Sequence, residues 1–208
     1  MHNILVINSS VSGNDSVSRL LVADVVAAVT RLNPGVRVTE RDLGAKPVPH
    51  LTADNVEGVR GSPATDEEHQ SRKLSDQLLG ELRAADTIIF GAPMYNFGLP
   101  TGLRAWFDYV LRAGETFSYS EAGPKGLLVG RRAIVVESRG GFYSDGPSSA
   151  IDFQEPYILH LLGFMGITDV TFIRAEKIGF GPEAREEAIA GAREEIVRLA
   201  RRVAALAA

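Results

Sequence analysis

The chain contains no cysteine. Disulfide bonds, thiol nucleophiles and thiolate metal sites are therefore excluded. Histidine is scarce as well, and its four copies show no spacing that is typical of metal ligands. We interpret these histidines as structural or solvent-exposed and predict no metal site. They are His2, His50, His69 and His160.

An excess of positive charge and long apolar runs are also missing. The net charge of −4 argues against general nucleic-acid binding, which needs a basic surface. The N-terminal segment MHNILVINSS lacks the features of a targeting peptide. The longest apolar stretch, YILHLLGFMGI, is too short to span a bilayer. We therefore predict a cytoplasmic protein that binds neither nucleic acid nor membranes.

What is present is a regular alternation of apolar patterns. The 208 residues suffice for one domain with a central sheet covered on both faces. Five short apolar or alternating runs predict strands, and segments with helical spacing separate them. This order predicts a parallel α/β sandwich formed by a single domain, residues 1–208. The predicted strands are 3–8, 36–43, 86–93, the first part of 132–141, and 168–175.

The predicted helices have recognisable starts and stops. The first begins near Ser18 and ends before the NPG turn at 33–35, and another follows Thr101, which we expect to be its N-cap. The last opens at Gly181-Pro182. Further helices are predicted over 66–84 and 152–165, and a polar excursion over 44–63.

Three loops follow predicted strands and carry unusual residues. In open parallel sheets, ligands bind beyond the carboxyl ends of the strands, where the strand order reverses. The loops at this edge are 9–18, 93–98 and 138–143. We therefore expect them to form the functional site together.

The first loop, SSVSGNDSVS, is rich in hydroxyls and leads into a helix. Free backbone N–H groups and the helix dipole favour a phosphate there. The loop has no lysine, so a triphosphate with magnesium would lack its usual anchors, whereas neutral donors suffice for a monophosphate. A capped turn in which the serines serve only the backbone is an equally open interpretation of this loop alone.

The second loop, PMYNFGLP, brings large apolar and aromatic side chains directly after a buried strand. A flat heteroaromatic ring would give them a surface to pack on, with Asn96 and backbone groups contacting its polar edge. The alternative is that they cover the core. Because the glycine and proline that follow shape the segment as a turn, we favour the ring.

The third loop, ESRGGFYS, contains Gly140 and Gly141 in succession. Glycine allows close approach of the backbone to a ligand, although for this loop taken alone we prefer a simple tight turn. Together, the three loops imply a ligand with a monophosphate at one end and a planar ring with polar edges at the other. FMN fits that description.

The segments SSVSGNDSVSR, APMYNFGLPTGLRAWFDYV, GETFSYSEAGPKGLL and VVESRGGFY together resemble the FMN-dependent NADH:quinone oxidoreductase/azoreductase family. The resemblance covers essentially the whole chain. It implies a flavodoxin-like fold, a doubly wound five-stranded parallel sheet of order 2-1-3-4-5 with helices on both faces. It also implies a homodimer with FMN near the subunit interface. The implied reaction is ping-pong transfer of two electrons from NADH or NADPH to quinones, or to azo compounds that are cleaved to amines.

The resemblance further implies roles for individual residues. Ser10 and residues 16–18 would hold the FMN phosphate, 94–97 would border the ring, and 138–141 would contact its other polar edge. The family often has glutamine where this chain has Val17. The implied cofactor-binding set is Ser10, Ser16, Val17, Ser18, Met94, Tyr95, Asn96, Phe97, Ser138, Arg139, Gly140 and Gly141.

No catalytic side chain is assigned, because the flavin carries the redox chemistry and protons can come from water. Phe97, and with it Phe117 and Tyr119, are candidates for an aromatic wall of the substrate pocket. Phe117 and Tyr119 fit the core or a dimer contact equally well. Arg139 would pair either with an acidic substrate or with a neighbouring carboxylate.

Two other classes of protein share part of this pattern. A flavodoxin-type electron carrier would have the same fold and FMN, but carriers tend to show an acidic docking face, whereas this chain mixes charges along its helices. A flavin-free nucleotide or phosphosugar binder would use only the first loop, and the aromatic second loop argues against it.

Overall fold

The computed structural model describes residues 3–205, with side chains as far as Arg201. Five parallel strands form the central sheet in the order β2-β1-β3-β6-β7. Since β6 and β7 are the fourth and fifth strands of this sheet, the predicted order 2-1-3-4-5 is confirmed. The strands are β1 (Asn3–Asn8), β2 (Arg37–Asp42), β3 (Thr87–Pro93), β6 (Arg132–Ser138) and β7 (Asp169–Ala175).

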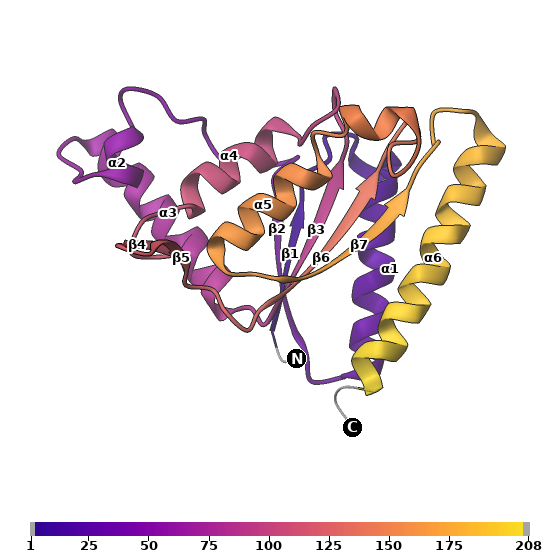
Figure 1. Cartoon of the computed structure of the whole chain (residues 1–208). Coiled ribbons are helices and arrows are strands. Elements are labelled where there is room, and N and C mark those ends of the chain that lie inside the picture. The colour runs from indigo at the N-terminus through magenta and orange to yellow at the C-terminus, as the bar shows by residue number, and fades with distance from the viewer. Residues whose placement is uncertain (1–2, 206–208) are drawn as a thin grey trace.

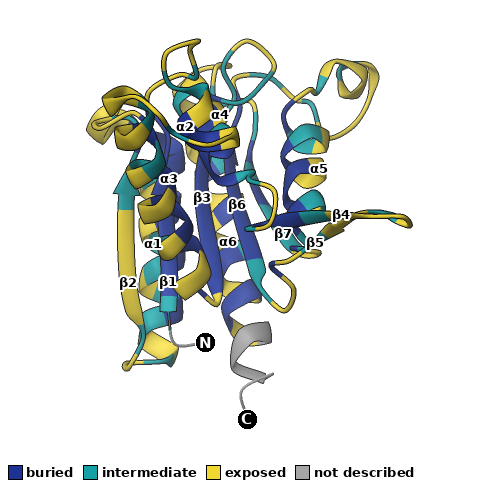
Figure 2. Cartoon of the chain, turned by 90° about the vertical axis from the view of Figure 1, so that its left-hand side faces the viewer, coloured by how far each residue is buried: buried dark blue, intermediate teal, exposed yellow. Residues whose placement is uncertain are grey.

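Helices cover both faces of the sheet (Figure 1). Along β1, Ile4 and Val6 face one core, and Leu5 and Ile7 face the other, as the alternation of side chains along a strand requires. The first core packs against α1 (Val17–Leu32) and α6 (Pro182–Ala205). The second packs against α3 (Asp66–Ala84), α4 (Thr101–Val110) and α5 (Glu155–Met165). In Figure 2 the central strands are buried and β2 forms an exposed edge.

Local hydrogen bonds explain where the helices begin. The Ser16 side chain accepts from the Arg19 amide at the start of α1, and Thr65 and Glu68 form a capping box at the start of α3. The prediction that Thr101 is the N-cap of α4 is wrong. Pro100 occupies that position without a side-chain cap, and Thr101 is the first helical residue.

Two irregular parts were incompletely predicted. The excursion 44–63 contains a short helix, α2 (Val56–Arg60), and the predicted helix over 152–165 begins only at Glu155, after a 3-10 helix, η2 (Pro147–Ile151). A separate antiparallel hairpin pairs β4 (Phe117–Ser120) with β5 (Gly123–Gly126). It projects from the body of the molecule in Figure 2.

The negative predictions concern the described part of the chain. His50, His69 and His160 are exposed, and no group of ligand-forming side chains among the described residues is arranged for a metal ion. His2 lies outside the described residues. Within the same residues, no helix has the length and apolar character needed to cross a bilayer.

Candidate functional site

The three predicted loops converge at the carboxyl edge of the sheet and line one cleft of about 180 Å³. In the sheet register Pro93 lies beside Ser138, so the second and third loops begin next to each other at the ends of neighbouring strands. Asn96 and Phe97 lie at the tip of the second loop, outside the set of lining residues. That set is Ser10, Ser12, Asp15, Ser16, Val17, Pro93, Met94, Tyr95, Ser138, Gly140, Ile178 and Arg185.

The two ends of the first loop, residues 9–10 and 16–18, are buried, residues 11–15 between them are exposed, and hydroxyls at both ends organise the backbone. Ser16 Oγ accepts from the Arg19 amide at 3.2 Å and contacts Ser18 Oγ at 3.1 Å. Ser10 Oγ accepts from the Ser12 amide at 3.2 Å. Because the first amides of an α-helix have no partner within the helix, the start of α1 presents N–H donors to the cleft. Val17 lines the cleft with an apolar side chain, so only its backbone can donate there.

Gly44, just after β2, packs against the backbone of the first loop. A Cβ atom at position 44 would overlap the carbonyl oxygen of Ser10, so the close approach of these backbones requires glycine. The Asp42 carboxylate fixes this turn by accepting from the Gly44 and Ala45 amides at 3.0 and 3.1 Å. No sequence pattern indicated this role, because Gly44 stands in a segment that is otherwise polar and irregular.

The substitution Gly44→Ala is expected to lower the free energy of unfolding by about 2 kcal/mol, because the added methyl group must displace the Ser10 backbone. Chemical denaturation measures this loss. Gly80→Ala is the matched control, since Gly80 is exposed within α3 and nothing lies near its Cβ position. We expect that variant to be stabilised by about 1 kcal/mol. Equal effects of the two substitutions would contradict the packing argument.

The second loop is a tight turn with an unusual backbone. Tyr95 and Gly98 exchange two backbone hydrogen bonds of 3.1 Å, and the two residues between them, Asn96 and Phe97, have φ of 48° and 70°. Positive φ at both central positions is the type I′ pattern, which normally selects Asn-Gly. A phenylalanine there is strained by about 1 kcal/mol or more.

Hydrogen bonds join this turn to both neighbouring loops. The Tyr95 hydroxyl accepts from the Val11 amide at 3.2 Å and lies 3.4 Å from Ser10 Oγ. On the other side, the Met94 amide donates to the Ser138 carbonyl at 2.9 Å. The turn that carries the aromatic tip is therefore held between the first and third loops.

The third loop keeps two backbone donors available. The Gly140 and Gly141 carbonyls accept from the Gly179 and Lys177 amides at 3.0 and 2.7 Å. Within the described part of the chain, the amides of both glycines have no hydrogen-bond partner. Gly140 lines the cleft. This turn can therefore donate N–H groups to a ligand edge.

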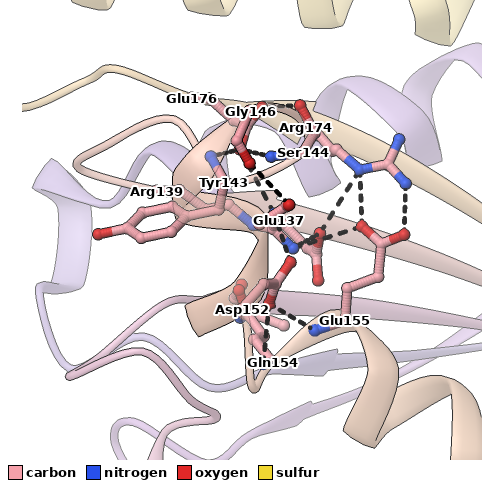
Figure 3. Close-up of polar contacts among 12 residues, drawn as sticks. Glu137, Arg139, Tyr143, Ser144, Gly146, Asp152, Gln154, Glu155, Arg174 and Glu176 are labelled. Carbon is pink, nitrogen blue, oxygen red and sulfur yellow. Dashed lines mark hydrogen bonds and ion pairs between the residues drawn. The ribbon is translucent and has the colours of Figure 1, made fainter.

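Arg139, like Ser18, Asn96, Phe97 and Gly141, belongs to the predicted set but is not among the residues that line the cleft. Its side chain is fully buried and turns into a group of carboxylates (Figure 3), and its amide donates to the Ala175 carbonyl at 2.9 Å. The amide and the guanidinium of Arg139 thus both make contacts within the fold, and its contact with the flavin edge stays a prediction. Of the two partners expected for this side chain, the structure has the neighbouring carboxylate.

Arg139 and Arg174, with the four carboxylates around them, form what we call the buried arginine cluster. The carboxylates belong to Glu137, Asp152, Glu155 and Glu176. Sequence patterns did not reveal this cluster. Arg139 lies 2.5 Å from Glu137, 3.0 Å from Asp152, and 3.4 Å from both Glu155 and Glu176. Glu155 in turn binds Arg174 through contacts of 2.6 and 2.7 Å. One available signal was Glu137 itself, an acidic residue within the apolar strand RAIVVES.

Burial dominates the electrostatics of Glu137. The pKa of this carboxyl is raised to about 8, chiefly by burial, while the Arg139 and Arg174 guanidinium groups lower it and the Glu155 and Asp152 carboxylates raise it. Neither Glu137 Oε1 nor Arg139 Nε has a hydrogen-bond partner in the part of the chain described. At neutral pH Glu137 is therefore largely protonated.

The cluster also holds the loop that follows the two glycines. Glu176 accepts from the Tyr143 and Ser144 amides at 2.8 and 3.1 Å, and from the Ser144 hydroxyl at 2.5 Å. Asp152 accepts from the first amides of α5, where Gln154 donates to the Ala92 carbonyl at 2.8 Å. Strand β6, the third loop and α5 are therefore fixed relative to one another.

The two aromatic residues proposed for a pocket wall lie elsewhere. Phe117 is buried where the hairpin meets α5, with its ring centroid 4.6 Å from that of Phe164. Tyr119 is exposed and contacts Phe117 edge-on at 5.4 Å. Neither residue lines the cleft within this chain.

Comparison with known proteins gives one consistent answer. The model of a family described by its flavodoxin-like fold matches residues 2–200. An FMN-dependent NADH:quinone oxidoreductase of Hyphomonas neptunium is 61% identical over 208 residues, which cover 100% of both chains. One of the same name from Ralstonia nicotianae is 47% identical over 91% of this chain and 92% of its own.

Solved structures agree with these sequence relatives. The crystal structure of an azoreductase from Bacillus anthracis Sterne superposes with a TM-score of 0.88 at 29% identity, over 97% of this chain and 100% of the other. An FMN-dependent NADH-azoreductase from Bacillus anthracis Ames Ancestor, solved with FMN, gives 0.88 at 26% identity, over 98% and 100%. With its strand order, its loops and these relatives taken together, the chain belongs to the FMN-dependent NADH:quinone oxidoreductase family of flavodoxin-like proteins.

Proposed function

We propose that this protein is an FMN-dependent oxidoreductase. In our proposal it transfers two electrons from NADH or NADPH to quinones by a ping-pong mechanism, and reductively cleaves aromatic azo compounds to amines. The observation that carries the proposal is that the first loop with its serines, the second loop with its aromatic residues and the third loop with its paired glycines meet at one cleft. The names of the relatives support both the cofactor and the substrate classes.

The donors present in the cleft fit FMN. Hydroxyls and the N–H groups at the start of α1 suit a phosphate, and the amides of Gly140 and Gly141, which have no partner among the described residues, suit the carbonyl edge of a flavin ring. We propose that Ser10, Ser16 and Ser18, with the Val17 amide, hold the phosphate. Residues 94–97 would border the ring, and Ser138, Gly140 and Gly141 would contact its polar edge.

When bound, the flavin supplies the two-electron redox chemistry. The chain contributes orientation and charge stabilisation. The Gly140 and Gly141 N–H groups would stabilise negative charge on the ring edge that they face, and the Phe97 ring would offer a flat surface for the nicotinamide and then for the oxidant. Because both substrates would use one position in turn, the donor must leave before the oxidant enters.

We expect Phe97, at the strained tip of the second loop, to raise catalytic activity while lowering the free energy of unfolding. The variants Phe97→Ala and Phe97→Gly both remove the ring, so both should lower kcat/KM for a quinone by about tenfold. Only glycine relieves the positive φ of 70°, so Phe97→Gly should exceed Phe97→Ala in unfolding free energy by about 1 kcal/mol. Steady-state kinetics and urea denaturation give the two quantities. Equal stability of the two variants would show that the turn is not strained.

We also propose a homodimer, with each chain acting as one domain in the cytoplasm, where NADH is available as donor. Exposed apolar side chains support a surface for the partner. They lie beside the second loop, because the Phe153 amide donates to the Phe97 carbonyl at 3.1 Å. Ile151, Phe153 and Leu159 are 42, 63 and 46% exposed. Analytical ultracentrifugation tests the assembly: Phe153→Glu should shift it toward monomer.

An absorption spectrum with two additions tests the central proposal. The purified protein should be yellow, lose its flavin colour on anaerobic addition of NADH, and regain it with a benzoquinone. A yellow protein that NADH cannot reduce would indicate an electron carrier. A colourless protein that does not take up added FMN would overturn the proposal.

A further inference from the structure

The first loop lacks a cation of its own. Arg19 stands nearby in the first turn of α1, but its guanidinium binds Asp42 at 2.8 and 3.0 Å, and it does not line the cleft. This ion pair raises the pKa of Arg19 and lowers that of Asp42, so both groups stay charged and paired. The charge needed to neutralise a phosphate must therefore come from another part of the chain.

Arg185 is the cationic side chain among the residues that line the cleft. It stands in the first turn of α6, which packs beside α1 (Figure 1). One turn further along, Ile189 is buried in the core shared by the two helices, so the start of α6 is held against the serine loop. The position of Arg185 in the cleft follows from this packing.

The side chain of Arg185 is also uncommitted. It is half-buried, and among the described residues its guanidinium has no hydrogen bond or ion pair. Asp15 is the acidic residue that lines the same cleft, and the two side chains form no ion pair within 4.0 Å. A phosphate placed between the serine loop and α6 would be repelled by Asp15 and attracted by Arg185.

From these observations we infer that Arg185 binds the phosphate group of FMN. A guanidinium can hold two phosphate oxygens at once, and its charge offsets both Asp15 and the missing side-chain donor at Val17. The inference rests on the proposed function, since it assigns one more residue to the same cofactor. It answers how a loop without lysine neutralises a dianion: the cation comes from the last helix.

The test compares two flavins that differ only in the phosphate. Flavin-free protein is titrated with FMN and with riboflavin, and dissociation constants are read from the quenching of flavin fluorescence. We expect Arg185→Ala to weaken FMN binding about tenfold and to leave riboflavin binding unchanged. Arg185→Lys, which keeps a point charge without the planar fork, should lie between the two. Added salt should weaken FMN binding more in the wild type than in Arg185→Ala.

Arg198→Ala is the matched control, because Arg198 lies on the same helix, outside the cleft, and among the described residues its one ion pair is with Glu194 at 3.6 Å. It should bind both flavins like the wild type. Equal weakening of FMN and riboflavin by Arg185→Ala, or no weakening of either, would overturn the inference. An effect confined to the KM for NADH in the FMN-loaded enzyme would indicate that Arg185 binds the diphosphate of NADH. That result would overturn the inference as well. Failure of the wild type to bind FMN would instead refute the proposed function.

Discussion

Replacing Arg139 by methionine is expected to lower the free energy of unfolding by about 3 to 5 kcal/mol. The substitution keeps most of the side-chain volume but removes the cation that lies 3.0 Å from Asp152 and 3.4 Å from both Glu155 and Glu176. Breaking one side of a buried ion pair costs this much because the remaining charges stay away from water. Urea denaturation measures the loss.

Arg132→Met is the control for this prediction. Arg132 begins the same strand, but it is partly exposed and its partner is the exposed Asp169 at 2.7 Å, so we expect a loss below about 1 kcal/mol. Hydrogen exchange should add a local signature for Arg139→Met, with faster exchange at the Tyr143 and Ser144 amides that Glu176 holds. If the two methionine variants were equally stable, the buried arginine cluster would not anchor the third loop.

The second large effect is a loss of stability at alkaline pH that depends on Glu137. Its pKa is raised from 4.5 to about 8, so the folded protein binds a proton that the unfolded chain releases. The stabilising contribution of the protonated form is complete below about pH 4.5 and disappears as the pH rises through 8. Between pH 6 and 9 this one group should lower the free energy of unfolding by about 2 to 3 kcal/mol.

Glu137→Gln isolates this contribution, because glutamine keeps the size of the protonated side chain and cannot ionise. The variant should match the wild type near pH 6 and be more stable at pH 9, while all other titrating groups contribute equally to both. Thermal unfolding across this pH range gives the comparison. Parallel stability curves for the two proteins would show that Glu137 is ionised throughout, paired with Arg139.

The central sheet and most helices could be predicted from sequence because their signals are local. NILVIN and DTIIFGAP are apolar runs bounded by turn residues, and these became the buried strands β1 and β3. The three loops could be grouped for a similar reason, since parallel strands bring their carboxyl ends to one edge. Serines before a helix and paired glycines have conformational roles that a single sequence displays.

What escaped prediction depends on contacts between distant segments. Arg139 could be assigned to a loop from sequence, but its side chain points inward because Glu176 and Asp152, from two other segments, surround it. The hairpin at 117–126 was missed because its strands are only four residues each and the second, GPKG, has glycine and proline in place of an apolar alternation. Likewise, the roles of Gly44 and Arg185 depend on which backbone and which helix lie beside the first loop.

The strand order has a consequence for the protein during its synthesis. The ribosome makes β1 first, yet this strand lies inside the sheet, and after β2 each new strand adds on the β3 side. The serine loop emerges early, whereas the segment 177–179 that holds the Gly140 and Gly141 carbonyls, and the helix that carries Arg185, emerge last. A nascent chain from which α6 has not yet emerged would therefore present an incomplete cleft.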